Sequence, residues 1–282
     1  MIRCSPALAV ACIGLAFLFL GCGIPSPRER LDQARLLVSH AGGEQGIFPN
    51  ASFDLFTWHR YLDRVQGRLL RVYIEGDGLA WRTPRQISED PTPLNPLGLK
   101  LALQDPTPSL LYLARPCQFI RDPDCGPKDW TSHRFSPQVL KAFTLVLDGI
   151  KKRYKPSGFV LFGYSGGGGI AALLAAHRSD VAGLVTIAGN LDIEKWVQIH
   201  GLTPLDGSLN PADYTKALEK IPQYHWVGGQ DRILGPAIYK SFEDRFVSKE
   251  NLHSKVHADH GHSRGWEAAW KDILKNFEKW KK

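Results

Sequence analysis

Several features that mark special classes of protein are absent from this 282-residue sequence. It contains no internal repeat and no low-complexity segment, which argues against a repeat array or a disordered chain. The 35 Lys and Arg residues outnumber the 28 Asp and Glu residues, but they are dispersed along the chain. Because nucleic-acid binding needs clustered positive charge, we expect no nucleic-acid partner. A hydrophobic content of 43% with 22% charged residues is ordinary for one globular domain.

Long apolar runs are confined to the N-terminus, where a short basic start precedes the apolar residues 7–20. This arrangement is typical of a secretory signal, and the Gly-Cys junction that follows resembles a bacterial lipobox. We therefore expect residues 1–21 to be a lipoprotein signal peptide and residues 22–28 to be a tether. Cys22 would carry the lipid, a diacylglycerol with palmitate. An ordinary signal peptide or a single anchor helix is the alternative, although the run is short for a membrane span.

The residue after Cys22 is Gly23, not the aspartate that resembles an inner-membrane retention signal. We therefore expect anchoring in the outer membrane, with the domain facing the periplasm.

Cysteine is otherwise scarce: after removal of the signal and lipidation of Cys22, only Cys117 and Cys125 are left. Two cysteines in an oxidising compartment are expected to pair, which would stabilise the fold by about 2–3 kcal/mol. Two buried free thiols are the alternative.

The most informative segment surrounds a lone serine. A short apolar run ends at Gly163, Ser165 follows, and four glycines lead into a segment of strong helix formers. This is the G-x-S-x-G pattern, in which the serine lies on a tight turn between a strand and a helix with its hydroxyl exposed to a cleft. Gly163 and Gly167 are needed because the turn brings two backbones too close for a side chain. Ser165 is therefore the candidate nucleophile.

Glycine-rich turns also bind nucleotides or serve only as turns. The segment lacks the Lys-Ser or Lys-Thr pair of a phosphate-binding loop. Gly166, Gly168 and Ala171 fit a loose dinucleotide fingerprint. The next predicted strand, 181–188, ends in Gly-Asn instead of an acidic residue, although Asp192 lies just beyond it. A nucleotide site and a purely structural turn therefore stay open as minor alternatives.

A serine nucleophile needs a base and an acid that orients the base, and in this architecture the acid and then the histidine follow the serine. Asp231 follows the predicted strand 222–228 and a glycine turn, which suits the acid. His262 lies in a polar loop between a short strand and a C-terminal helix, and it is the first choice of base. His260, in the same loop, is the second choice. The alternative for Asp231 is an ordinary turn aspartate.

Residues 257–262, His-Ala-Asp-His-Gly-His, also allow a metal-site interpretation, because imidazole and carboxylate are zinc ligands. Alternation along a strand would separate His257 from His260. No second ligand set with supporting spacing occurs elsewhere in the sequence. We therefore expect no metal and no other cofactor, and keep a metal-dependent hydrolase as a less favoured alternative.

The apolar segment 69–74 is followed by a Glu-Gly-Asp-Gly loop. In hydrolases of this build, the loop after the equivalent strand and the residue after the nucleophile each donate a backbone N–H to an oxyanion. Those residues are here Asp77 and Gly166. We expect the Asp77 side chain to turn away and bond to its own loop, because a carboxylate aimed at the oxyanion would oppose catalysis. A plain glycine turn is the alternative.

Apolar segments alternate with helix-like segments over most of the chain, and residues 29–282 are expected to form one domain. Strands are expected near 53–58, 69–75, 110–114, 158–164, 181–188 and 222–228, and helices at 28–39, from Asn95-Pro96, at 137–152, after Ser165, near 211–220 and at the C-terminus. This alternation predicts an α/β fold with a mostly parallel sheet covered by helices on both faces.

Helix ends and faces add further expectations. Asn95 should cap a helix with Pro96 in its first turn. The insertion 190–221, before the strand that leads to Asp231, is long enough for only a partial lid, and its Trp196, Leu202 and Leu205 would pack on the body or shape a substrate pocket. The terminal helix has one apolar face, which is expected to dock against the sheet instead of a membrane surface. This face comprises Trp266, Trp270, Ile273, Leu274, Phe277 and Trp280.

With these features in place, the chain resembles the α/β-hydrolase superfamily, and in particular a group of proteobacterial lipoproteins within it. The shared stretches are VYIEGDGLAW from Val72, DPTPLNPLGLKLA from Asp90, YLARPCQ from Tyr112, GYSGGGG from Gly163 and the His-x-x-Gly-Trp ending from His262. The last pattern favours His262 over His260. The resemblance implies an α/β-hydrolase fold, a mostly parallel twisted sheet with helices on both faces, and hydrolase chemistry.

The residues and the resemblance together predict an envelope serine hydrolase, esterase- or lipase-like, that cleaves ester, thioester or amide bonds through an acyl-enzyme intermediate. Its partners would be a small-molecule or lipid-like ester and, through the lipid anchor, the membrane. The protein is expected to be a monomer. A non-catalytic binding protein of the same fold is the main alternative. The sequence does not determine the acyl group or the leaving group of the substrate. It also does not determine whether the acyl-enzyme is hydrolysed or transfers its acyl group to another acceptor.

Overall fold

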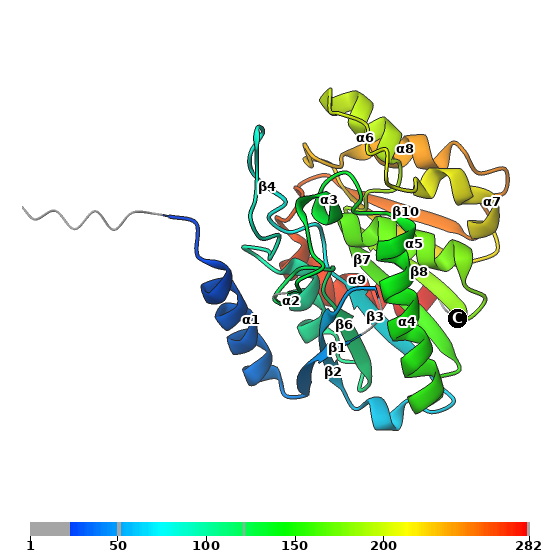
Figure 1. Ribbon diagram of the computed structural model, residues 1–282. Helices are drawn as coiled ribbons and strands as arrows, with labels where there is room; N and C mark the ends of the chain where they lie inside the picture. Colours follow the sequence, from blue (N-terminus) through cyan, green and yellow to red (C-terminus); the bar gives the residue numbers. More distant parts are fainter. Residues whose placement is uncertain (1–22, 50–51, 121, 281–282) are drawn as a thin grey trace, which may run out of the picture.

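The computed structural model describes residues 23–49, 52–120 and 122–280. An eight-stranded sheet runs through the molecule in the order β1-β2-β6-β3-β7-β8-β9-β10 (Figure 1). Its strands are β1 (Glu44–Phe48), β2 (Leu55–Arg60), β3 (Leu69–Ile74), β6 (Leu110–Leu113), β7 (Gly158–Tyr164), β8 (Val181–Ile187), β9 (Gln223–Gly228) and β10 (Leu252–His257). The last six are parallel to one another, whereas β1 and β2 join one edge in antiparallel pairing. The predicted mostly parallel sheet is therefore confirmed.

Helices cover both faces of the sheet, as predicted. On one face lie α4 (Pro137–Tyr154), α5 (Gly166–His177), α7 (Thr215–Leu218) and α8 (Pro236–Glu243). On the other face lie α1 (Pro27–Ala41), α2 (Leu97–Gln104) and α9 (Trp266–Trp280). Shorter elements sit in the connections: η1 (Leu62–Arg64), β4 (Trp81–Thr83), β5 (Gln86–Ile87), α3 (Pro127–Trp130), α6 (Ile193–His200) and η2 (Pro211–Tyr214).

The terminal helix α9 docks against the sheet, as its apolar face predicts. Trp266, Trp270 and Phe277 are fully buried, and Ile273 and Leu274 expose at most 3% of their surface. The ring of Trp270 meets the rings of two strand residues edge-on, at 6.2 Å each. The side chain of Trp280 lies outside the described part. Burial of these large side chains against β3 and β7 fixes the end of the chain that follows His262.

The start of α2 differs from the expectation. The residue that caps the helix is Pro96, and Asn95 makes no side-chain cap. The first N–H groups of the helix instead donate to a carboxylate from another part of the chain: Gly98 N to Glu75 Oε1 and Leu99 N to Glu75 Oε2, each at 3.0 Å. A buried carboxylate satisfies these unpaired N–H groups and the positive end of the helix dipole better than a neutral amide does.

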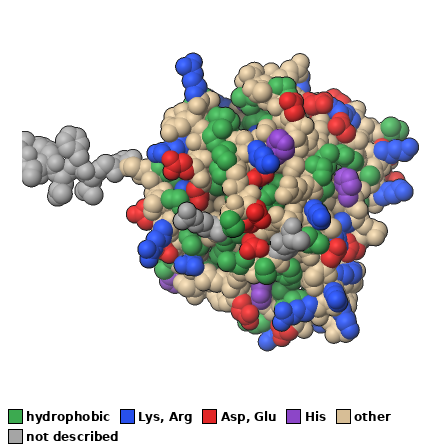
Figure 2. Space-filling view, viewed as in Figure 1, with side chains coloured by type: hydrophobic (Ala, Val, Ile, Leu, Met, Phe, Trp, Pro, Cys, Tyr) green, Lys and Arg blue, Asp and Glu red, His purple; other side chains and the backbone are tan. Residues whose placement is uncertain are grey.

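The signal peptide and the lipidated Cys22, both predicted from the sequence, lie outside the described residues. Within the described part, no helix combines the length and the apolar character that a membrane crossing needs. Figure 2 shows basic and acidic side chains interspersed over the visible face, in line with the dispersed charges of the sequence.

Candidate active site

Ser165 lies in the turn between β7 and α5, at the edge where the parallel strands end (Figure 1). Its backbone has φ 52° and ψ −122°, a region that a residue with a Cβ adopts only at an energetic cost. Hydrogen bonds hold this conformation: the Ser165 N–H donates to the Ile187 carbonyl at 3.0 Å. Its carbonyl accepts from the N–H groups of Gly168 and Asn190 at 2.9 and 3.0 Å.

The glycines around the serine are required by close backbone approach. A Cβ added at Gly163 would lie 2.3 Å from the carbonyl oxygen of Gly167. A Cβ added at Gly167 would lie 2.3 Å from the carbonyl oxygen of Ile74. Real Cβ atoms do not approach backbone this closely, so the steric reason given from the sequence for both glycines is confirmed.

His262 connects the serine to Asp231. Its Nε2 lies 3.0 Å from Ser165 Oγ, and its Nδ1 lies 2.9 Å from Asp231 Oδ2. The other oxygen of Asp231 accepts hydrogen bonds from the N–H groups of Ile233 and Leu234, at 2.8 and 2.9 Å. Burial alone would raise the pKa of Asp231, but the hydrogen bonds from His262 and the two N–H groups hold this pKa below its usual value. An ionised Asp231 favours the tautomer with its proton on Nδ1, which leaves the Nε2 lone pair for the serine hydroxyl.

The second-choice base, His260, lies elsewhere. Its ring packs against Trp266 at 4.6 Å and against His257 at 4.5 Å, and its Nε2 has no hydrogen-bond partner among the described residues. Burial lowers the pKa of both His257 and His260. The expected separation of His257 from His260 is therefore wrong: β10 ends at His257, and the turn that follows brings the two rings together near Trp266, away from His262 at the serine. In the described part of the chain, no three His, Cys, Asp or Glu side chains converge as metal ligands.

The loop after β3 lies against the serine. A Cβ added at Gly76 would lie 3.1 Å from Ser165 Cβ. The backbone N–H groups of Asp77 and Gly166 donate to no described residue. Gly166 is the first residue of α5, whose positive dipole end lies at Ser165. Two unpaired N–H groups beside a serine are suited to donate hydrogen bonds to a developing oxyanion.

The Asp77 side chain does not bond to its own loop, so that expectation is wrong. Its Oδ1 accepts from Arg115 Nη1 at 2.8 Å, and its Oδ2 accepts from Arg134 Nη1 at 3.1 Å. Two guanidinium groups from distant segments bind the carboxylate more strongly than neutral N–H groups of the loop would. The carboxylate also lies over Gly166, where an added Cβ would be 2.0 Å from Asp77 Oδ1. The two arginines neutralise the negative charge that would otherwise oppose an oxyanion.

Glu75 has a role in this site that the sequence analysis missed. It is 1% exposed and accepts four hydrogen bonds at 2.9–3.0 Å, from the N–H groups of Gly76, Gly98 and Leu99 and from the hydroxyl of Tyr112. Burial raises the pKa of Glu75 even though all four donors lower it. The carboxylate therefore ties Gly76 to α2 and β6. Gly76 is the first residue of the loop 76–79, which we call the oxyanion loop after the role expected from the sequence. A glutamate directly after a buried strand was the signal available in the sequence.

A disulfide joins Cys117 and Cys125, with Cα atoms 5.8 Å apart, so the predicted pairing is present. Next to it, Gln118 donates from Nε2 to the Gly76 carbonyl at 2.9 Å. The Oε1 of Gln118 accepts from the Arg115 N–H at 3.1 Å. The closed loop thus supports the oxyanion loop through the Gly76 carbonyl, whereas Glu75 binds the Gly76 N–H.

A pocket of about 420 Å³ opens over these residues. Its polar lining includes Ser165, His262, Glu75, Asp77 and Arg134, and its apolar lining comprises Leu79, Ala80, Trp81, Pro93, Leu94, Trp196 and Ile233. Three of the apolar side chains, Trp81, Leu94 and Ile233, expose between 42% and 48% of their surface. A mostly apolar pocket with a few converging polar groups is typical of a small-molecule site.

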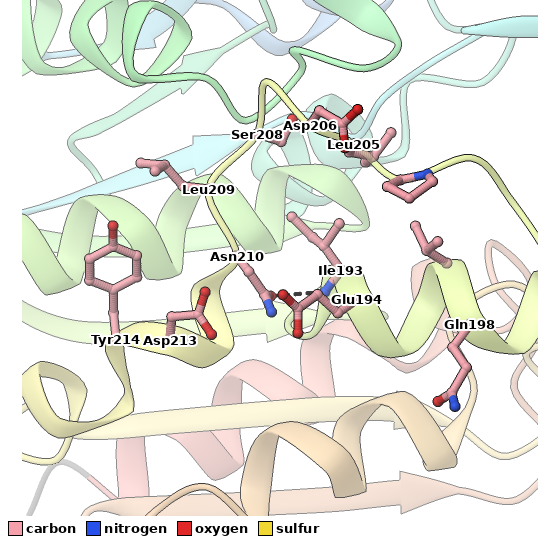
Figure 3. A pocket seen from close by; sticks show the side chains of 12 residues that line it. Ile193, Glu194, Gln198, Leu205, Asp206, Ser208, Leu209, Asn210, Asp213 and Tyr214 are labelled. Carbon is pink, nitrogen blue, oxygen red and sulfur yellow. Dashed lines mark hydrogen bonds between the residues drawn. The ribbon is translucent and has the colours of Figure 1, made fainter.

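Helix α6 separates this pocket from a second cavity of about 520 Å³, shown in Figure 3. Ile193, Glu194, Val197 and Gln198 line the second cavity from one face of α6, whereas Trp196 lines the serine pocket from another face. The carboxylates of the second cavity include Glu194 and Asp213, which pair with Arg245 at 3.5 and 2.8 Å. Neither the serine nor its histidine lines this cavity. Of the other insertion residues, Leu202 is 42% exposed and Leu205 packs against the core.

Comparison with solved structures places the chain among proteins of similar fold. The Pyrococcus furiosus esterase Pf2001 superposes with a TM-score of 0.60 at 12% identity, over 92% of this chain and 95% of that chain. A Klebsiella pneumoniae protein assigned as a dienelactone hydrolase gives a TM-score of 0.61 at 15% identity, over 85% and 97% of the two chains. An acetyl xylan esterase from Paenibacillus sp. R4 gives 0.57 at 14% identity, over 88% and 92%. No protein-family model and no curated protein matches the sequence.

The sheet order, the helices on both faces and these similarities define an α/β-hydrolase fold. The serine, histidine and aspartate lie where the strands β7, β10 and β9 end or just beyond them. At identities of 12–15%, the similarity carries the fold alone. The chemistry must therefore be argued from the site.

Proposed function

We propose that the protein is a serine hydrolase that cleaves carboxylic esters or thioesters through an acyl-enzyme. The observation that carries the proposal is the continuous hydrogen-bonded chain from Ser165 Oγ through His262 to Asp231, at 3.0 and 2.9 Å. Further support comes from two unpaired backbone N–H groups beside the serine, those of Asp77 and Gly166. Nucleophile, base, orienting acid and oxyanion donors are the parts that acyl transfer needs.

In the proposed first step, Ser165 Oγ attacks the carbonyl carbon of the ester while His262 Nε2 takes the hydroxyl proton. The carbonyl oxygen becomes an oxyanion and accepts hydrogen bonds from the N–H groups of Asp77 and Gly166. Asp231 stabilises the resulting imidazolium. The tetrahedral intermediate then collapses, the bond to the leaving group breaks, and His262 returns its proton to the departing alcohol or thiol.

In the second step, water attacks the acyl-enzyme and His262 takes one proton from this water. Collapse of the second tetrahedral intermediate releases the carboxylic acid, and the proton returns to Ser165 Oγ. The pocket opens to solvent beside the serine, which gives water a route to the acyl group.

We further propose that the enzyme acts as a monomer in the bacterial envelope, anchored through Cys22 to the outer membrane and facing the periplasm. Support comes from the apolar residues 7–20, the Gly-Cys junction and the residue after it. A Cys22→Ser variant should leave the membrane fraction after cell breakage, whereas the parent stays with the membranes. Recovery of both forms in the membrane fraction would contradict the lipid anchor.

The test of the catalytic proposal uses the full chain, purified in detergent, with para-nitrophenyl acetate and its thioester analogue. We expect turnover by the parent, nearly complete loss in Ser165→Ala and in His262→Ala, and a far smaller change in His260→Ala. The last variant is the matched control, because His260 lies in the same loop but does not reach the serine. Equal activity of the parent and Ser165→Ala would contradict the proposal and favour a non-catalytic binding protein.

A further inference from the structure

Arg134 is buried and yet lines the substrate pocket. Its side chain is 7% exposed, and it is among the residues around Ser165 and His262 in the pocket of about 420 Å³. Its guanidinium makes one side-chain hydrogen bond among the described residues, from Nη1 to Asp77. Its Nε is buried with no partner. Because arginine has several N–H donors in a fixed fork, most of the hydrogen-bonding capacity of Arg134 is unused.

The charges around Arg134 do not balance. Asp77 is the only carboxylate that pairs with it among the described residues, and Asp77 is shared with Arg115. Arg115 directs its second terminal nitrogen to the backbone carbonyl of Arg134, so it is held by protein groups on both ends. The other two carboxylates of the site are already occupied, Glu75 by four donors and Asp231 by His262. One positive charge at the pocket wall is therefore left without a counter-charge.

A second unpaired donor lies next to Arg134. The guanidinium carbon is 4.8 Å from the centre of the Trp196 ring, which orients the planar group by a cation–π contact. Trp196 lines the same pocket, and its buried Nε1 has no partner within the part of the chain that the structure describes. Buried donors usually have an acceptor, and an oxygen group of a ligand in the pocket would supply one here. Two such donors around one surplus positive charge favour an anionic oxygen ligand.

We propose that the substrate is an ester that carries a second, anionic oxygen group, a carboxylate or a phosphate, which Arg134 binds while Ser165 attacks the ester carbonyl. This inference rests on the proposed hydrolase function and names its substrate class. Arg134 is a specificity-determining residue in this account, with Trp196 as a supporting donor. The apolar lining at Trp81, Leu94 and Ile233 would contact the rest of the substrate.

The test compares esters that differ only in this charge. One pair changes the acyl group: para-nitrophenyl hemiglutarate against the corresponding glutaramate. The other changes the leaving group: meta-acetoxybenzoate against meta-acetoxybenzamide. We expect the ratio of kcat/KM, anionic over neutral, to be roughly 10 to 100 in at least one pair, the range of one charge-assisted hydrogen bond. In Arg134→Gln this ratio should fall to near one, and in Arg134→Lys part of it should be kept.

Arg115→Gln is the matched control, because it also removes an ion pair with Asp77 but leaves the guanidinium of Arg134 in the pocket. Its absolute activity should fall, since Asp77 belongs to the oxyanion loop. The ratio between anionic and neutral esters should fall less than in Arg134→Gln, because the surplus positive charge is lost but the guanidinium that contacts the anion stays. A ratio near one for the parent in both pairs would overturn the inference. So would an unchanged ratio in Arg134→Gln.

Competition distinguishes the two kinds of anion. Inhibition of para-nitrophenyl acetate hydrolysis by glutarate would identify the anionic group of the substrate as a carboxylate, and inhibition by inorganic phosphate would identify it as a phosphate. If neither compound inhibits, the proposed anion site is contradicted. The outcomes also separate this inference from the proposed function. Turnover of neutral esters that depends on Ser165, without any charge preference, leaves the hydrolase standing and removes the anion site. Absence of turnover for every ester removes both.

Discussion

Replacement of Glu75 by glutamine should damage both the stability and the activity of the protein. The carboxylate accepts four hydrogen bonds, two on each oxygen: Gly76 N and Gly98 N on Oε1, and Leu99 N and the Tyr112 hydroxyl on Oε2. A glutamine amide must place an NH₂ group against two of these donors and leave them unpaired. Each unpaired buried donor costs about 1–3 kcal/mol, or about 2–6 kcal/mol for two.

The lower half of this range is expected, because burial raises the pKa of Glu75 and the variant no longer buries a charge. We therefore predict a loss of about 2–3 kcal/mol in the free energy of unfolding, measured by urea titration. Displacement of Gly76 should also move the N–H of Asp77 relative to Ser165. We expect kcat/KM for para-nitrophenyl acetate to fall roughly 10- to 100-fold, the range for a small misplacement of a catalytic group.

Asp105→Asn provides the matched control. Asp105 is also a 1% exposed carboxylate, and it accepts from Arg71 at 2.8 Å and from the Tyr73 hydroxyl at 2.5 Å, near the opposite end of β3. Its replacement should cost a similar amount of stability with kcat/KM unchanged at temperatures where the variant is folded. If Glu75→Gln loses stability but keeps kcat/KM, as the control does, the reasoning about the oxyanion loop is wrong.

Four further outcomes follow from the site and its surroundings. Asp231→Asn should lower kcat about 10⁴-fold, as in a well-studied triad, because the amide favours the wrong tautomer of His262. An unchanged kcat would contradict the orienting role of Asp231. The pKa of Asp231 in the folded protein lies below its usual 3.8, so the ionised form stabilises the fold above about pH 4. This contribution is lost as the pH falls through the folded pKa. Urea titrations from pH 7 to pH 3 should therefore show a free energy of unfolding that depends less on pH in Asp231→Asn than in the parent. Ser165→Gly should have a free energy of unfolding about 1 kcal/mol higher than Ser165→Ala, because the φ of 52° strains any residue with a Cβ. Equal free energies for the two variants would show that the turn is not strained. Replacement of Cys117 and Cys125 by serine should lower the free energy of unfolding by about 2.5 kcal/mol, because the disulfide closes a small loop. The value of kcat/KM should also fall, since the loop positions Gln118. A free energy of unfolding equal to that of the parent would contradict the supporting role of the disulfide.

Much of the fold was predictable because its signals are local. The apolar run before Ser165, the four glycines after it and the helix formers beyond them lie within 20 consecutive residues, and the structure places β7 and α5 there. The apolar face of the terminal helix was also readable from its spacing. The short strands β1, β4 and β5 were not predicted, because their side chains are largely exposed. The helices α6 and α8 were also not predicted, because each has only eight residues, which is too short for a periodic pattern to be distinguished from a loop.

The residues that shape the site were harder to predict, because their roles depend on contacts between distant segments. Asp77 carries no local sign that its partners are Arg115 and Arg134, which lie 38 and 57 residues away. Glu75 caps a helix that begins more than 20 residues later, so the sequence suggested Asn95 as the cap instead. Local capping rules fail where a buried charge from another element reaches the same N–H groups.

The most direct test of the central claim is the location of a fluorophosphonate adduct by peptide mass spectrometry. If His262 activates Ser165, the full chain treated with a tagged fluorophosphonate should carry the label on Ser165. The label should disappear in His262→Ala and persist in His260→Ala. An absence of label on folded protein, or equal labelling of the parent and His262→Ala, would contradict the claim that these residues form a working triad.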